Sequence, residues 1–121
     1  MAYSNVKDTK VHQKSFQLAM EIFDVSKSFP SEEKYSLTGQ IRRSSRSVTI
    51  CLLEAYRKKI YPAHFVSKLS DCDMENSETS GWLEFALACG YISKEKFEHL
   101  FFQSEEVGKM PGHMIKNPEK Y

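Results

Sequence analysis

The side chains with the clearest chemistry in this sequence are basic ones gathered in one segment. The chain holds 17 Lys and Arg, and every arginine lies between positions 42 and 59. The basic residues there are Arg42, Arg43, Arg46, Arg57, Lys58 and Lys59, and the acidic residue among them is Glu54. A planar guanidinium group can bind two phosphate oxygens at once. The segment therefore predicts a nucleic-acid-binding surface, for RNA or DNA, made by these six basic residues.

The same arginines have a second interpretation, as partners in ion pairs. Residues 69–93 contain no Lys or Arg, and their acidic residues are Asp71, Asp73, Glu75, Glu78 and Glu84. In a helical hairpin of the two segments, Arg43 comes level with Thr79, close to two of these carboxylates. The pairing can run within one chain or between subunits of a ring. We favour ion pairs for Arg42 and Arg43, and phosphate contacts for residues 57–59, which have fewer acidic neighbours.

Catalytic and metal-binding patterns are missing from the sequence. The four histidines are dispersed, without the His-x-x-x-His or Glu-x-x-His spacing of a helical metal site. The glycines are isolated, so there is no phosphate-binding loop, and no nucleophile motif surrounds a Ser or Cys. We expect a protein that is not an enzyme and that carries no cofactor and no metal.

Four helices must position the basic residues. The chain has only 5 Gly and 4 Pro, which disfavours a turn-rich β fold. Helices are expected at roughly 6–28, 32–59, 62–90 and 93–114, with a C-terminal tail at 115–121. The second carries an apolar stripe stepping by three and four residues, which includes Leu37, Ile41 and Val48. Long helices with short connections fold back on each other, so we predict one all-α domain over residues 1–121, an antiparallel up-and-down four-helix bundle.

Particular residues mark the expected helix ends. Ser31 and Ser93 are expected to cap the second and fourth helices, and Gly90 to end the third. Pro111 and Gly112 are expected to end or kink the fourth helix, because a proline ring clashes with the carbonyl group four residues earlier. The residues after Pro111 are then expected to form a loosely held tail.

Other residues bear on assembly and location. Ile50 and Leu53 lie on the side of the second helix away from its apolar stripe, beside arginines, and this predicts a homo-oligomer interface. No apolar run has the length of a membrane span or a signal sequence. Three scattered cysteines fit a reducing compartment better than a disulfide framework. We expect a cytoplasmic protein without a membrane partner.

One stretch of the sequence is similar to a known family. Its residues are Phe29-Pro30, Glu33, Tyr35, Leu37, Gln40-Ile41-Arg42-Arg43, Ser47 and Glu54, followed later by Gly90-Tyr91-Ile92-Ser93. This pattern resembles the 23S rRNA intervening-sequence protein family, and the likeness spans about Val11 to Met114. Accessory variability determinants of diversity-generating retroelements resemble the same family. The chain departs from the usual pattern at Cys51 and Ala55, where Asn and Gly are common.

The resemblance implies a fold, an assembly and partners. It implies a four-helix bundle that forms a pentamer, since family members of known structure form five-fold rings. The retroelement branch implies nucleic acid and a reverse transcriptase as partners. We therefore expect a non-enzymatic oligomeric protein that binds nucleic acid through the basic surface of its second helix. The alternative is a structural or protein-interaction module whose helix-two arginines are used in ion pairs.

Overall fold

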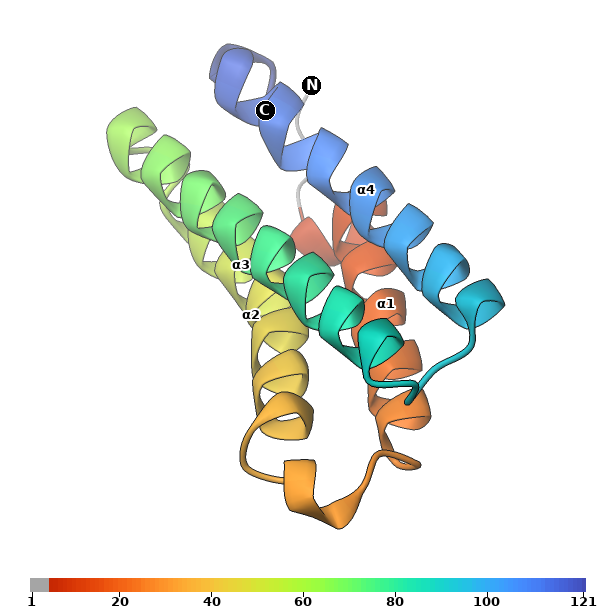
Figure 1. Cartoon of the computed structure of the whole chain (residues 1–121). Coiled ribbons are helices and arrows are strands. Elements are labelled where there is room, and N and C mark those ends of the chain that lie inside the picture. Colours follow the sequence, from red (N-terminus) through yellow and green to blue (C-terminus); the bar gives the residue numbers. More distant parts are fainter. Residues whose placement is uncertain (1–4) are drawn as a thin grey trace.

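The computed structural model describes residues 5–121 and is built from four long helices (Figure 1). They are α1 (Lys10–Ser26), α2 (Leu37–Arg57), α3 (Pro62–Ala88) and α4 (Lys94–Lys116). Successive helices run in opposite directions, and α1 also packs against α4, so the helices close into an antiparallel up-and-down bundle. No strand occurs in residues 5–121. The predicted all-α four-helix bundle is confirmed.

Local capping explains three of the helix ends. The Thr9 hydroxyl accepts a hydrogen bond from the His12 amide at 3.2 Å at the start of α1. The Ser93 hydroxyl accepts one from the Lys96 amide at 3.0 Å at the start of α4, as expected from the sequence. Gly90 follows α3 with φ of 77°, a left-handed conformation that glycine adopts without strain. The ends marked by Ser93 and Gly90 were predicted from the sequence, whereas α1 starts four residues later than the predicted residue 6.

The second helix begins five residues later than predicted. Ser31 starts a short 3-10 helix (Ser31–Glu33), and α2 starts at Leu37. The cap is Glu33: its carboxylate accepts hydrogen bonds from the Ser36 hydroxyl at 2.7 Å and from the Leu37 amide at 3.3 Å. Tyr91, after α3, donates to the other oxygen of Glu33 at 2.8 Å. A contact distant in sequence therefore holds the acidic residue that caps α2.

The prediction that Pro111 ends the fourth helix was wrong. The helix continues through Pro111 to Lys116 and is followed by a 3-10 helix, Pro118–Lys120. The proline ring is buried in the bundle, so apolar burial offsets the lost backbone hydrogen bond. Tyr121 is half-buried against the core, and its hydroxyl is 2.5 Å from His113 Nδ1. Ile115 and Tyr121 therefore pack the end of the chain against the bundle, in contrast to the predicted loose tail.

The core is an apolar column with polar contacts that set the helix register. Fully buried residues come from every helix, with Ile22, Ile41, Leu69 and Leu100 each 0% exposed. Buried hydroxyl pairs join α1 to α2 (Ser15–Thr49, 2.9 Å) and α2 to α3 (Ser44–Thr79, 2.8 Å). The amide of Asn76 in α3 donates to the carbonyl of Ser104 in α4 at 2.8 Å. Burying such groups is tolerated only when they are paired, so each contact favours one alignment of its two helices.

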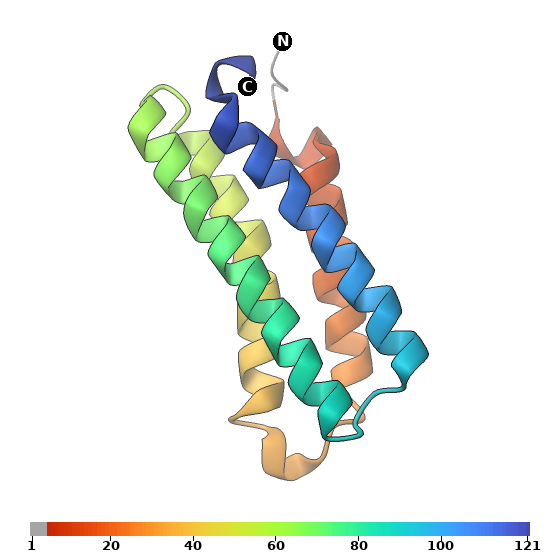
Figure 2. The same cartoon turned by 45° about the horizontal axis from the view of Figure 1, so that its top comes forward.

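The up-and-down topology brings distant segments together at one end of the bundle. The start of α1, the α2–α3 connection and the end of α4 meet there, and the other two connections lie at the opposite end (Figures 1 and 2). No helix within residues 5–121 is both long enough and apolar enough to span a bilayer.

Candidate nucleic-acid interface

Arg43 forms ion pairs with two carboxylates of α3. Its guanidinium lies 3.0 Å from a carboxylate oxygen of Glu75 and also contacts Glu78. The indole nitrogen of Trp82 donates to Glu78 at 3.2 Å. Hydrogen bonding to Glu75 raises the pKa of Arg43 above its ordinary value. The predicted hairpin register and the predicted ion pair of Arg43 are both confirmed, and this guanidinium is already satisfied.

Arg42 is also occupied, by a contact that the sequence did not predict. Its Nε donates to the Ser26 hydroxyl at 2.8 Å, and its guanidinium carbon lies 4.7 Å from the centre of the Phe23 ring. No carboxylate in the described chain lies within ion-pairing distance of Arg42. The ion pair expected for Arg42 within one chain is therefore not formed, because this side chain contacts Ser26 and Phe23 of α1.

Arg46 is the exposed cation in the middle of α2. Its guanidinium carbon lies 5.4 Å from the centre of the same Phe23 ring. The structure gives Arg46 no carboxylate partner within the described residues. Its exposure fits a ligand contact, but its two nearest arginines in the sequence, Arg42 and Arg43, are held by other side chains.

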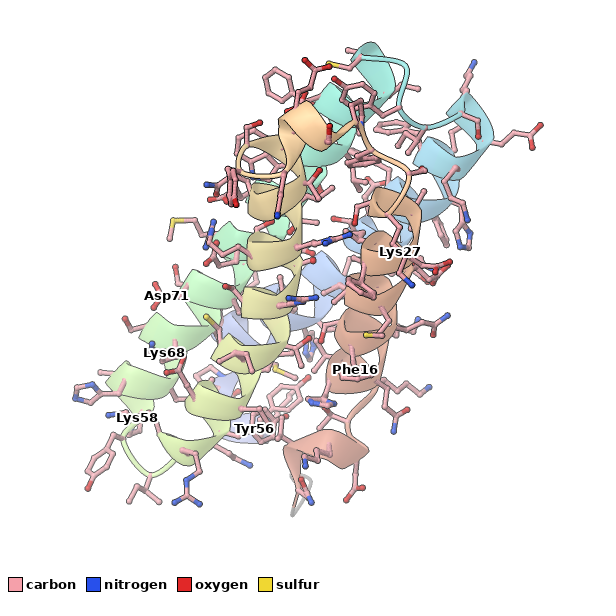
Figure 3. All side chains as sticks on the ribbon, turned by 90° about the horizontal axis from the view of Figure 1, so that it is seen from below. Phe16, Lys27, Tyr56, Lys58, Lys68 and Asp71 are labelled. Carbon is pink, nitrogen blue, oxygen red and sulfur yellow. The ribbon has the colours of Figure 1, made fainter. Side chains whose placement is uncertain are left out.

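The end of α2 carries three consecutive basic residues. Arg57 is the last helical residue, Lys58 follows it, and both are exposed. Lys59 is half-buried, with its ammonium 5.0 Å from the centre of the Tyr56 ring. None of the three has an ion-pair partner among residues 5–121. Figure 3 shows Lys58 near the tip of the bundle, beyond Lys68 and Asp71 of α3.

The topology surrounds these three residues with further basic groups. We call this end of the bundle, residues 5–16, 51–70 and 108–121, the cationic pole. It holds ten Lys and Arg against three Asp and Glu, a net charge of +7, while residues 17–50 and 71–107 sum to −6. The pole's basic residues are Lys7, Lys10, Lys14, Arg57, Lys58, Lys59, Lys68, Lys109, Lys116 and Lys120. A near-neutral chain is thus strongly polarised along its long axis.

Most of the pole's positive charge is unpaired. Lys14 pairs with Glu106 at 3.5 Å, and Lys68 lies 3.4 Å from Glu54 and 3.9 Å from Asp71. The other eight basic residues have no carboxylate within 4.0 Å in the part of the chain described. Sequence reasoning missed the lysines of α1 and α4, because they are far in sequence from Arg57. Assigning each charge to a bundle end from the alternating helix direction would have found them.

The two residues predicted to form an oligomer interface differ in exposure. Ile50 is 53% exposed, whereas Leu53 is half-buried and packs against the core. Phe16 of α1, 55% exposed, lies at the same level as Ile50, because their neighbours Ser15 and Thr49 share a hydrogen bond. Phe16 projects from the side of the bundle in Figure 3. Ile50 and Phe16 therefore contribute to one exposed apolar patch on α1 and α2.

The metal-ligating side chains and the cysteines of the described residues have the following surroundings. Among the described residues, no group of three or more His, Cys, Asp or Glu could hold a metal ion. Burial raises the pKa of the Cys72 thiol to about 12 and also raises that of Cys51, which disfavours the reactive thiolate.

The family model of the 23S rRNA-intervening sequence protein matches residues 7–113. The chain belongs to this family. No curated protein matches the sequence. A solved structure of a protein with unknown function from the S23 ribosomal protein family of Bacteroides thetaiotaomicron is 32% identical, with a TM-score of 0.82. The match covers 92% of this chain and 99% of that one. The family membership predicted from the sequence is confirmed, and the fold is shared over nearly the whole chain.

Proposed function

We propose that this member of the 23S rRNA-intervening sequence protein family is a non-enzymatic cytoplasmic protein that binds nucleic acid through its cationic pole. The observation that supports this most directly is the set of eight unpaired basic residues at one end of a nearly neutral chain. Lysines and arginines gathered on one face are the electrostatic footprint of a phosphate-binding surface. The opposite end, with its excess of carboxylates, would repel the same ligand.

The phosphate-binding surface is smaller on α2 than the six-residue surface predicted from the sequence. Arg42 and Arg43 are held by Ser26, Glu75 and Glu78, so releasing them would cost contacts that already exist. Residues 57–59 have no ion pair to break among the described residues, although the ammonium of Lys59 lies over the Tyr56 ring. The phosphate-binding surface is therefore centred on the end of α2, together with nearby lysines of α1 and α4, and Arg46 contributes at most at its edge.

The test replaces Arg57, Lys58 and Lys59 together with Gln. Binding to a labelled oligonucleotide of about 16 nucleotides is measured by fluorescence anisotropy between about 50 and 200 mM salt. The affinity should fall, and the slope of log K against log salt should become shallower by roughly 2 to 3, because each lost phosphate contact removes about 0.7–0.9.

A matched control carries the same change in charge at the opposite end. Lys34, Lys94 and Lys96 are exposed and lie outside the pole, so their replacement with Gln should leave the salt slope unchanged. An equal loss in both variants would show a diffuse net-charge effect. No binding by the unmodified protein at low salt would overturn the proposal.

A second candidate function, a self-assembling interaction module, is supported by the apolar surface of α1 and α2. Phe16, Met20 and Ile50 are 55%, 49% and 53% exposed, and grouped exposed apolar residues often mark an interface. The family resemblance favours a pentamer. Light scattering should show an oligomer that dissociates in an Ile50→Asp variant and persists in a Met74→Asp variant, since Met74 is exposed on α3. A monomer for the unmodified chain would exclude this assembly.

A further inference from the structure

The cationic pole contains two small hollows, and Tyr121 lines both of them. One, of about 240 Å³, lies between the start of α1 and the end of α4 and is lined by Thr9, Lys10, Val11, Lys109, Met110, His113, Met114 and Tyr121. The other, of about 190 Å³, is lined by Lys59, Pro62, Phe65, Pro118, Glu119 and Tyr121. An aromatic ring therefore stands between two hollows in the most positive region of the molecule.

Tyr121 is held in place from one side. Its hydroxyl lies 2.5 Å from His113 Nδ1, and the rings of the two residues meet edge to face with centroids 5.8 Å apart. The residue packs against the core and remains partly exposed. A ring fixed at its hydroxyl end, beside an open hollow, is a preorganised stacking surface.

The residues that line the larger hollow suit a ligand with a flat ring and a negatively charged group next to it. Val11, Met110 and Met114 give it an apolar floor, and methionine adapts its shape to flat aromatic partners. Lys10 and Lys109 stand at its rim, and neither is engaged by a carboxylate among the described residues. No carboxylate lines this hollow, whereas Glu119 lines the smaller one. An anionic ligand would therefore favour the larger hollow.

We propose that the hollow beside Tyr121 accepts one unpaired base of a single-stranded nucleic acid, while Lys10 and Lys109 contact its flanking phosphates. This inference rests on the proposed function and specifies its ligand. Bases in a duplex are stacked on each other, so only an unpaired base can enter a side-chain pocket. Base stacking on an aromatic residue tolerates any sequence, so the site selects single strands and not a particular sequence.

The first test compares three forms of the protein with two forms of nucleic acid. Tyr121→Ala should weaken binding of a single-stranded oligonucleotide about tenfold, the size expected for one stacked base. Tyr121→Phe keeps the ring and loses the hydrogen bond to His113, so it should bind nearly as well as the unmodified protein. Binding of a duplex of equal length should be the same in all three, because a duplex uses phosphate contacts alone.

The second measurement does not depend on any variant. A single-stranded oligonucleotide should shift the NMR methyl signals of Met110 and Met114, and a strand of the same length with abasic sites should not. Shifts confined to Lys10 and its neighbours with both strands would overturn the inference and leave the phosphate-binding function intact. Equal loss of single-strand and duplex binding in Tyr121→Ala would also overturn it. If neither strand nor duplex binds, the proposed function itself fails.

Discussion

The middle and the end of α2 carry the same kinds of basic side chain in different surroundings. In the middle, Arg42 contacts α1 through Ser26 and Phe23, and Arg43 pairs with two carboxylates of α3. At the end, residues 57–59 lie past the last carboxylates of the hairpin and have no ion-pair partner among the described residues. Arg42 and Arg43 therefore join helices, whereas residues 57–59 keep their charges free of ion pairs within the described chain.

The basic residues in the middle and at the end of α2 differ in their surroundings more than in their number. A side chain in the middle of a bundle helix has neighbouring helices on both sides, and these neighbours hold the guanidinium groups of Arg42 and Arg43. At a bundle end, three segments distant in sequence meet, and nothing in the packing requires their charges to cancel. The pole can therefore keep a net charge of +7 while the remainder sums to −6. We expect changes in the middle to affect stability and changes at the pole to affect binding.

The largest effect on stability should come from Asn76, which lies in the middle of the bundle. Asn76 is 5% exposed, and its amide donates to the Ser104 carbonyl at 2.8 Å. Asn76→Ala removes this hydrogen bond and leaves a gap between α3 and α4, so the free energy of unfolding should fall by about 2 kcal/mol. Urea denaturation measures the change. Ser77→Ala, at an exposed neighbouring position, is the control and should change stability by less than about 0.5 kcal/mol.

Arg43 should have a smaller effect of the same kind. Arg43→Gln leaves Glu75 and Glu78 without their cation, but the arginine side chain is 47% exposed, so water screens much of the interaction. The expected loss of stability is about 1 kcal/mol. Arg46→Gln is the matched control on the same helix, because Arg46 has no ion-pair partner among the described residues. Equal losses in the two variants would mean that the ion pairs contribute nothing specific.

Glu21 should make the stability of the protein depend on pH. Burial raises the pKa of Glu21, but hydrogen bonds from Gln103 and His99 outweigh burial and place it below its ordinary value of 4.5. A lowered folded-state pKa stabilises the protein above the unfolded-state value, and this contribution is lost as the pH falls through the folded-state value. Its size should be below about 1 kcal/mol. Stability measured between about pH 7 and pH 3 should therefore decline less in Glu21→Gln than in Glu98→Gln, a change at an exposed position of α4.

The smallest effect on stability should come from the pole. Replacing Arg57, Lys58 and Lys59 with Gln breaks no ion pair in the described chain and reduces repulsion among neighbouring lysines. Thermal unfolding should show a change within about 0.5 kcal/mol, toward higher stability if repulsion matters. A large destabilisation would contradict the distinction between the two regions, because it would give the pole a role in holding the fold.

The sequence by itself determined the parts of this protein that depend on periodicity and near neighbours. Apolar residues at helical spacing placed the four helices, and Ser93 and Gly90 marked ends that the structure confirms. The hairpin register also followed from the sequence. Short connections make adjacent helices antiparallel, so Arg43 had to lie near Glu75 and Glu78. Family membership followed from the same segment.

Only the tertiary structure decided features that join residues far apart in the chain. The start of α2 depends on Glu33, which Tyr91 of the α3–α4 connection holds by a hydrogen bond. Pro111 stays inside α4 because the bundle buries its ring, which the local rule for proline does not consider. The cationic pole exists because four antiparallel helices bring separated lysines to one end, where Tyr121 lies beside them. Periodicity specifies the face of each helix, whereas the charge around a site depends on every segment that ends there.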